Sequence, residues 1–359
     1  MSKNGMTRAE FTAQHDPSPE VLRLRSYVKQ LESENTRLNR QTGIDERLFQ
    51  SVREEISAIA PARAVRYKAP VLNHDPLHPA LIVTDVHAEE LVLSEEMEGL
   101  AEYDWPICVG RMQATVQKTL ELVNIQRQAS VIDELHVWAL GDWFNGKIQP
   151  QEEAWGNSMP FPKAVAKVSM QFAHMIASLA PHFKSVRVTG MCGNHGRDSK
   201  KTVFKATADR NWDMTVYLIA QEFCGNLNNV TWDIPNSIMH VTEIGGWKPL
   251  LTHSGEVNMN NRTPYYPIET TFDLEHKARS GTGKDFTHVF TGHWHHHAVL
   301  DSSIVMCPSM IGANQFSRFK LHRNSTPEQL LVFFTEKHGL IQQQPIKLID
   351  AEPAALEDL

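Results

Sequence analysis

The stretch ALIVTDVH, residues 80–87, decides the fold class. Its apolar run is short enough for a buried strand, and it ends in polar residues that include Asp85 and His87. The same arrangement recurs in HVWALGD (136–142) and SVRVTGMCGNH (185–195), and stretches with helical periodicity lie between the runs. Short buried strands that alternate with helices are typical of βαβ units, so we predict an α/β domain with a largely parallel core.

Strand-like runs dominate the second half of the chain. They lie at 230–234, 238–244, 248–256, 287–293 and 298–306. Because these runs follow one another closely, we expect this half to be more antiparallel than the first. A last β-rich segment, at about 326–349, is expected to return to the sheet.

The residues before this α/β body have a different character. Residues 1–20 are polar and contain two prolines, which predicts a disordered leader. Residues 21–58 have helical periodicity, and residues 59–77 are rich in proline, which predicts a linker because proline interrupts helices. We therefore expect a helical extension and a linker before a body at 78–349, with a short tail at 350–359.

The helical extension carries a heptad seam. Its apolar positions alternate three and four residues apart, with β-branched residues and one Asn at a and Leu at d: Val21, Leu24, Val28, Leu31, Asn35 and Leu38. This pattern favours a parallel two-stranded coiled coil and hence a homodimer. The alternative is a single amphipathic helix packed on its own domain, since the seam spans fewer than three heptads.

Composition and charge exclude several classes of protein. With 35 basic and 42 acidic residues the net charge is −7, which excludes a protein that coats nucleic acid through its overall charge. The four cysteines form no CxxC pair, which argues against a zinc knuckle and a disulfide scaffold. No apolar run reaches the ~18 residues of a membrane span, and no apolar signal segment begins the chain. We therefore expect a cytoplasmic protein with no membrane partner.

Residues that can bind metals follow five of the predicted strands. They are Asp85, His87, Asp142, Asn194, His195, His253, His293 and His295. The carboxyl ends of strands converge on the functional cleft in open α/β folds. Aspartate can bridge two cations, and neutral imidazole suits Zn, Fe, Mn, Ni or Co. The series predicts a site for two divalent ions ~3.5–4 Å apart, which can clamp a phosphate and activate a hydroxide for attack.

The ordered motifs D-x-H, GD, GNH, strand-end His and GH-x-H resemble those of the calcineurin-like metallophosphoesterase superfamily, over about residues 85–295. The resemblance implies a four-layer α-β-β-α sandwich with a dinuclear metal site at the strand ends. The ligands of the first ion would be Asp85, His87 and His295. The second ion would have Asn194, His253 and His293, with Asp142 as the bridge between the two.

By the same resemblance, His195 would contact the phosphate and protonate the leaving group rather than bind metal. Departures from the family pattern narrow the subtype. The residues after GNH and GD differ from those of protein phosphatases, and Asn145 stands where purple acid phosphatases have an iron-binding Tyr. The acid that usually orients the histidine is missing after His195, and either a backbone carbonyl or Asp198 could replace it.

A basic segment, RDSKKTVFKATADR (197–210), directly follows the GNH motif and carries a local charge of +3. We interpret it as a track for a phosphate backbone, with Arg197, Lys200 and Lys201 as substrate-binding residues. The alternative is a solvated helix face.

These features predict a metal-dependent phosphoesterase that uses water activated between two divalent ions, with Mn²⁺ favoured and Fe, Zn, Ni or Co as alternatives. We favour phosphodiesters of nucleic acid or nucleotides as substrate, because the chain also resembles phage-encoded and repair-nuclease-like members of the superfamily. If the chain is phage-encoded, its location is the cytoplasm of the host cell. A phosphomonoesterase is the alternative enzyme. A catalytically inactive scaffold is less favoured, since every expected ligand position is filled.

Overall fold

The computed structural model describes residues 75–146, 156–199, 203–257 and 264–355, and five exposed helical residues nearer the N-terminus: Tyr27, Lys29, Ser33, Gln50 and Glu54. The chain divides into two compact units, Met1–Ala58 and Ile59–Leu359. The predicted leader, the heptad-seam residues, most of the linker, and Lys200 and Lys201 lie outside the described residues. Predictions for them stay predictions.

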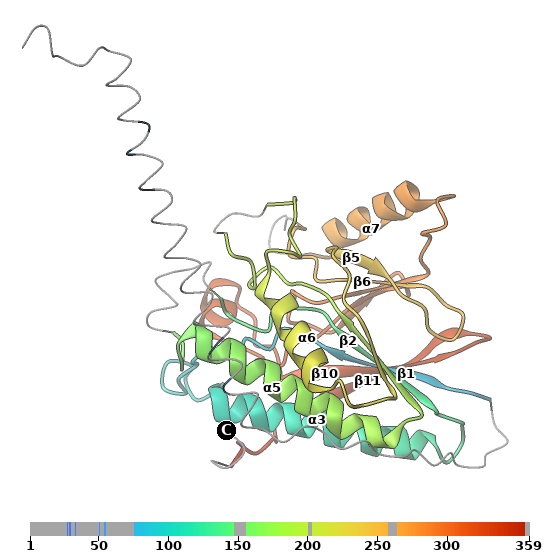
Figure 1. Ribbon diagram of the computed structural model, residues 1–359, viewed down its shortest axis with the longest axis horizontal. Helices are drawn as coiled ribbons and strands as arrows, with labels where there is room; N and C mark the ends of the chain where they lie inside the picture. The colour runs from blue at the N-terminus through green and yellow to red at the C-terminus, as the bar shows by residue number, and fades with distance from the viewer. Residues whose placement is uncertain are drawn as a thin grey trace, which may run out of the picture. The chain divides into compact units, whose positions relative to one another are not determined.

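A six-stranded sheet in the larger unit has the order β11-β10-β1-β2-β3-β4 (Figure 1). Its strands β1 to β4 run parallel to one another, as their alternation with helices predicts. The chain returns at β10, which pairs antiparallel with β1 and places Val332 opposite Ala80, so the expected return of the C-terminal segment is confirmed. The strands are β1 (His78–Val83), β2 (Glu134–Ala139), β3 (Ser185–Gly190), β4 (Val230–Asp233), β10 (Glu328–Thr335) and β11 (Gly339–Lys347).

A five-stranded sheet has the order β5-β6-β7-β9-β8. Its strands are β5 (Met239–Val241), β6 (Pro249–Thr252), β7 (His288–Thr291), β8 (Ala298–Leu300) and β9 (Ile304–Met306). The expectation of a more antiparallel second half is wrong for the centre of this sheet, where β6, β7 and β9 are parallel, because a helical crossover joins β6 to β7. The run at 298–306 is a hairpin rather than one strand, since Asp301 and Ser302 turn the chain with positive φ angles.

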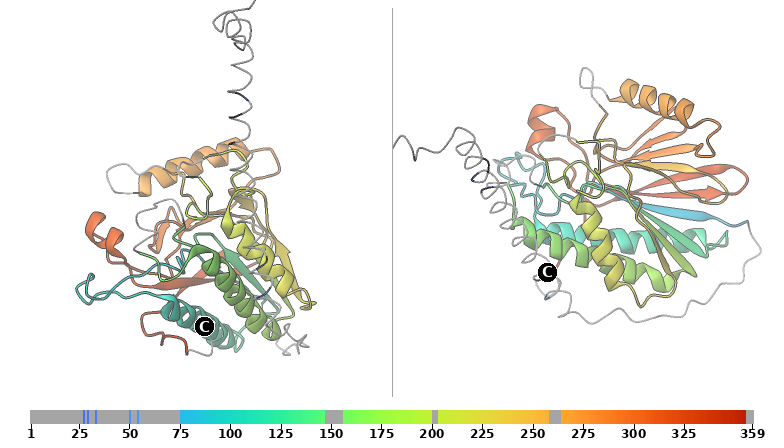
Figure 2. Two further views of the ribbon diagram at one scale, coloured as in Figure 1. Left: turned by 60° about the vertical axis from the view of Figure 1, so that its left-hand side comes forward. Right: turned by 45° about the horizontal axis from the view of Figure 1, so that its top comes forward.

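Helices lie on both sides of the paired sheets, with α3, α5 and α6 on one side and α7 on the other (Figure 2). Their bounds are α3 (Trp105–Gln126), α5 (Phe161–Leu179), α6 (Trp212–Phe223) and α7 (Tyr265–Arg279), with short turns η1 (Ala180–His182) and η2 (Phe316–Lys320). Capping side chains begin two of them: Asp104 accepts from the N–H of Ile107, and Asn211 accepts from that of Asp213. Among the described helices, none is both long and apolar enough to span a membrane.

The inner faces of the two sheets form one core. Ile82, Trp138 and Leu330 of the first sheet share a cluster of fully buried side chains with Leu251 and Phe290 of the second. The rings of Trp138 and Phe290 meet with centroids 4.9 Å apart. The two sheets therefore pack face to face.

The opposite face of the second sheet is covered by α7. Successive residues of a strand point to opposite faces, so Leu250 turns away from the inner core and packs with Val289, Ile268 and Phe272. The mixed α/β fold with two sheets, expected from the sequence, is confirmed. This packing holds the carboxyl ends of β1, β2, β3, β6 and β7 in one region.

Candidate metal centre

Each metal-binding residue predicted from the sequence follows one of these five strand ends. Asp85 and His87 follow β1, and Asp142 follows β2. The loops after β1 and β2 are joined by backbone hydrogen bonds: the N–H of Asp85 donates to the Gly141 carbonyl at 3.1 Å, and that of His87 donates to the Asp142 carbonyl at 3.1 Å. Adjacent parallel strands thus hold their polar ends at a fixed spacing.

Asp85, His87 and His295 form a first cluster of ligand atoms within 4.8 Å of one another. Nε2 of His295 lies 3.1 Å from Oδ1 of Asp85 and 3.3 Å from Nε2 of His87. Two imidazole nitrogens so close together need a proton or a cation between them. Among the described residues, none hydrogen-bonds Nδ1 of His87, which lies 4.0 Å from a carboxylate oxygen of Glu90.

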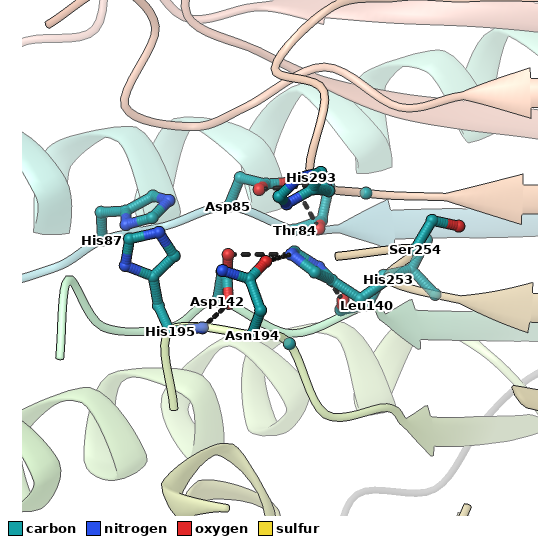
Figure 3. A network of polar contacts seen from close by, with 12 residues as sticks. Thr84, Asp85, His87, Leu140, Asp142, Asn194, His195, His253, Ser254 and His293 are labelled. Atoms are coloured by element: carbon teal, nitrogen blue, oxygen red, sulfur yellow. Dashed lines mark hydrogen bonds and ion pairs between the residues drawn. The ribbon is translucent and has the colours of Figure 1, made fainter. Parts of the chain in front are cut away.

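A second cluster consists of Asp142, His253 and His293, again with ligand atoms within 4.8 Å of one another. Nε2 of His253 lies 2.8 Å from Oδ2 of Asp142 and 3.1 Å from Oδ1 of Asn194. The structure therefore brings Asn194 to this second cluster (Figure 3). Nδ1 of His253 lies 2.8 Å from the carbonyl of Leu140, which holds the ring in place.

The two clusters lie side by side. The backbone N–H of His293, in the second cluster, lies 3.0 and 3.1 Å from the two carboxylate oxygens of Asp85, in the first. Asp142 lies between His195 and His253 in Figure 3, and Oδ1 of Asp142 accepts the N–H of His195 at 2.7 Å. That Asp142 bridges two ions stays a prediction.

Backbone strain is concentrated in these residues. Five of the six residues in the two clusters have a positive backbone φ angle, which is uncommon for residues other than glycine. The angles are 51° at Asp85, 47° at His87, 54° at Asp142, 72° at His293 and 51° at His295. Such strain persists where the surrounding structure holds it, and it is typical of functional sites.

Two glycines allow the side chains to approach so closely. A Cβ on Gly292 would lie 2.9 Å from both Oδ2 of Asp85 and Nδ1 of His253. A Cβ on Gly255 would lie 2.7 Å from Cβ of Asn194. Any side chain at either position would displace a member of the site.

Electrostatics favour a cation at the centre. Burial raises the pKa of Asp85, but His295 and His253 together outweigh burial and lower that pKa to about 2. Burial lowers the pKa of His253, but Asp142, Asp85 and the Leu140 carbonyl together outweigh burial and raise that pKa to about 10. For His293, burial and the neighbouring His253 lower the pKa to about 3. The site thus combines ionised carboxylates with neutral imidazole at His293.

The residues present fit two divalent ions. Each cluster offers one carboxylate oxygen and two imidazole nitrogens, and Asn194 adds an amide oxygen to the second. Mixed nitrogen and oxygen ligands suit Mn, Fe, Co, Ni or Zn, whereas Ca²⁺ and Mg²⁺ are bound mainly by oxygen.

His195 lies beside the clusters without belonging to either. Its ring meets that of His87 edge-on, with centroids 4.8 Å apart. Its Nδ1 lies 2.7 Å from the backbone carbonyl of Asn145. The sequence left two candidates for the group that orients His195, and in the structure this group is a backbone carbonyl. Asp198 instead pairs with Arg210 at 2.8 Å.

Two buried acids near the site were missed in the sequence. Asp213, in the first turn of α6, accepts from the N–H groups of Asp142 at 2.9 Å and Gly193 at 2.8 Å. Burial and the nearby Asp142 raise its pKa to about 6. Glu89 accepts from the N–H of Gly146, and burial raises its pKa to about 7. The sequence feature that could have identified Asp213 is its position in the first turn of a predicted helix, directly after the N-cap residue Asn211 and Trp212.

The predicted substrate residues are only partly described. Arg197 is folded back on its own loop, where its side chain donates to the carbonyls of Asn194 at 2.8 Å and Ser199 at 3.0 Å. Burial lowers its pKa. Lys200 and Lys201 lie outside the described residues, so their role stays a prediction.

Comparisons with known proteins return distant likenesses. No family model matches the sequence, and no curated protein matches it. Among solved structures, Vacuolar Protein Sorting 29 from Cryptosporidium parvum is 12% identical, covering 77% of this chain and 100% of its own, with a TM-score of 0.30. A predicted phosphoesterase from Streptococcus pneumoniae is 11% identical, covering 75% and 97%, with a TM-score of 0.28. The sulfate thiohydrolase SoxB from Thermus thermophilus is 10% identical, covering 81% and 60%, with a TM-score of 0.35. At these TM-scores the likenesses assign no family.

Proposed function

We propose that this chain is a metal-dependent phosphodiesterase of the calcineurin-like metallophosphoesterase type, with the four-layer sandwich of that family. The observation that carries the proposal is the pair of adjacent ligand clusters, which hold two carboxylates and four imidazoles around a common centre and in which five of the six residues have strained backbone. Paired sites of this kind suit two-metal hydrolysis of phosphate esters.

Divalent ions in these clusters would supply positive charge to the phosphate and acidity to water. The chain's own residues hold the ligand side chains in place and supply the proton for the leaving group. The ligand side chains are held in place by further contacts on their other atoms. For example, Nδ1 of His253 lies 2.8 Å from the backbone carbonyl of Leu140. The Nδ1–H of His195 donates to the Asn145 carbonyl, so Nε2 is the ring atom that takes up a second proton, and the resulting imidazolium can pass that proton to the leaving-group oxygen.

Hollows beside both clusters favour a diester over a monoester. A groove of about 520 Å³ adjoins His295 of the first cluster and is lined also by Tyr265, Arg323 and Lys347. A smaller cavity adjoins Asn194 and His253 at the second cluster. A phosphodiester carries two ester-linked groups on its phosphorus, and each hollow can receive one of these groups. A monoester carries one such group and would occupy only one hollow.

Nucleic acid or a nucleotide is the diester that we favour. Arg197 and Lys205 line the smaller cavity, and the predicted contacts Lys200 and Lys201 lie between them in the sequence. Cationic side chains beside a phosphate site supply affinity that does not depend on sequence. We further propose that the coiled-coil seam pairs two chains. Mn²⁺ is the ion we favour.

A substrate panel tests the proposal. Purified protein with Mn²⁺, Ni²⁺ or Mg²⁺ is assayed on bis-p-nitrophenyl phosphate, p-nitrophenyl phosphate and labelled DNA, with Asp142→Asn as the matched control. We expect the diester to be hydrolysed faster than the monoester, and the variant to lose at least ~10³-fold of the rate. Faster turnover of the monoester would establish a phosphomonoesterase instead. Equal rates for the wild type and the variant would overturn the metal-dependent activity.

A further inference from the structure

Glu89 is a fully buried acid whose carboxylate is committed to one loop. Its Oε2 accepts the backbone N–H of Asn145 at 3.1 Å, and its Oε1 accepts that of Gly146 at 2.9 Å. Burying a carboxylate costs free energy unless its oxygens are satisfied. Here both oxygens are used to hold two consecutive backbone N–H groups.

The backbone of Glu89 is itself fixed. Its carbonyl accepts from the N–H of Ser158 at 2.6 Å and from the hydroxyl of Ser158 at 3.1 Å. The side chain therefore projects from an anchored point and reaches the loop after β2 from the loop after β1. This contact is separate from the backbone pairing of the same two loops at Asp85 and His87.

The loop that Glu89 holds contacts His195 in two ways. The Asn145 carbonyl lies 2.7 Å from Nδ1 of the imidazole. Gly146 lies against the His195 backbone so closely that a Cβ there would collide with the His195 carbonyl, and its φ is +75°. A carbonyl oxygen can only accept, so in the neutral ring Nδ1 must carry the proton.

We propose that Glu89 is a positioning residue that, through the Asn145–Gly146 backbone, fixes the orientation and tautomer of His195. The proposal deepens the function proposed above, since its effect on rate rests on His195 acting as the proton donor. Its structural part, the link from Glu89 to the His195 tautomer, does not depend on catalysis.

The tautomer is measured by ¹⁵N NMR of histidine-labelled protein, with the His195 resonances assigned by their loss in His195→Ala. In the metal-free wild type we expect the neutral His195 ring to be protonated at Nδ1 and unprotonated at Nε2. In Glu89→Gln, an NH2 group, which cannot accept a hydrogen bond from a backbone N–H, replaces one of the two acceptor oxygens. We therefore expect the Asn145 carbonyl to shift and both neutral tautomers of His195 to be populated. Gly146→Ala displaces the same loop with Glu89 intact and should give the same change.

Asp198→Asn is the matched control, because it makes the same chemical change at an acid that pairs with Arg210. It should leave the His195 resonances unchanged. With Mn²⁺ bound, Glu89→Gln should keep its metal content and lose about 10- to 100-fold in rate on a phenyl diester, and less on the p-nitrophenyl diester.

Two results would overturn the proposal: a neutral wild-type His195 whose one ring proton lies on Nε2, or wild-type His195 resonances in Glu89→Gln and Gly146→Ala. The wild-type measurement can overturn the proposal even if both variants fail to fold. If the tautomer changes as expected while no chain hydrolyses any diester, the positioning role stands and the proposed function fails.

Discussion

The carboxylate of Asp213 accepts the backbone N–H of Asp142 at 2.9 Å, and the same oxygen accepts that of Gly193 at 2.8 Å. One buried side chain at the start of α6 thereby joins the loops after β2 and β3. The other oxygen lies 3.2 Å from the N–H of Trp143. Asp213 thus holds the backbone that presents Asp142 and Asn194 to the second cluster.

Asp213→Asn should destabilise the fold and weaken metal binding. The amide leaves a buried N–H without an acceptor, which costs about 1–3 kcal/mol of unfolding free energy. The displaced loops should weaken metal affinity by about 10- to 100-fold. Thermal unfolding and metal titration measure the two effects. Asp273→Asn, at an exposed site on α7, is the control. Unchanged metal affinity in Asp213→Asn would remove its role at the site.

His195→Ala should keep both ions and lose rate. The imidazole contacts the clusters without belonging to either, so the metal content of the variant should equal that of the wild type. Loss of a general acid costs about 10²–10⁴-fold. The loss should be smaller for p-nitrophenolate, a leaving group that needs no proton. Loss of an ion in elemental analysis would show that His195 is a ligand.

The basic segment should control binding of polynucleotides and not of small esters. Replacing Lys200, Lys201 and Lys205 together by Ala should weaken DNA binding and flatten its salt dependence, because each phosphate contact releases about one counterion. Hydrolysis of bis-p-nitrophenyl phosphate should change little, since that ester reaches only the centre of the site. Fluorescence anisotropy over a salt series measures the binding. An unchanged salt slope would exclude this segment as the nucleic-acid track.

The N-terminal segment should set the oligomeric state. Deleting residues 1–60 removes the predicted seam and leaves every proposed ligand in place. Light scattering should give a dimer for the full chain and a monomer for the truncated one, with similar rates per site on the diester. A monomeric full chain would refute the coiled coil. A truncated chain that remains dimeric would place the interface in the larger unit.

The sequence predicted the strand ends well because their pattern is local. An apolar run followed by Asp, Asn or His marks one strand end, and parallel strands in one layer must bring such ends together. Grouping residues from different sheets, such as Asp85 with His295, came from the family resemblance, and the structure places their side chains 3.1 Å apart.

What the sequence left undecided depends on contacts far apart in the chain. The sequence left either an unspecified backbone carbonyl or Asp198 as the partner of His195, since nothing local shows which way the loop after β2 turns. Glu89 reaches 56 residues along the chain to hold that loop. The parallel centre of the second sheet was missed for a similar reason, because strand-like runs by themselves do not show the order in which strands pair.

Anomalous diffraction from a crystal of the full chain grown with Mn²⁺ tests the central claim most directly. We predict two peaks per chain, ~3.5–4 Å apart as in two-metal sites. One should lie among Asp85, His87 and His295, and the other among Asp142, His253 and His293. A single peak, or no peak, at saturating Mn²⁺ would contradict the dinuclear centre on which the proposed function rests.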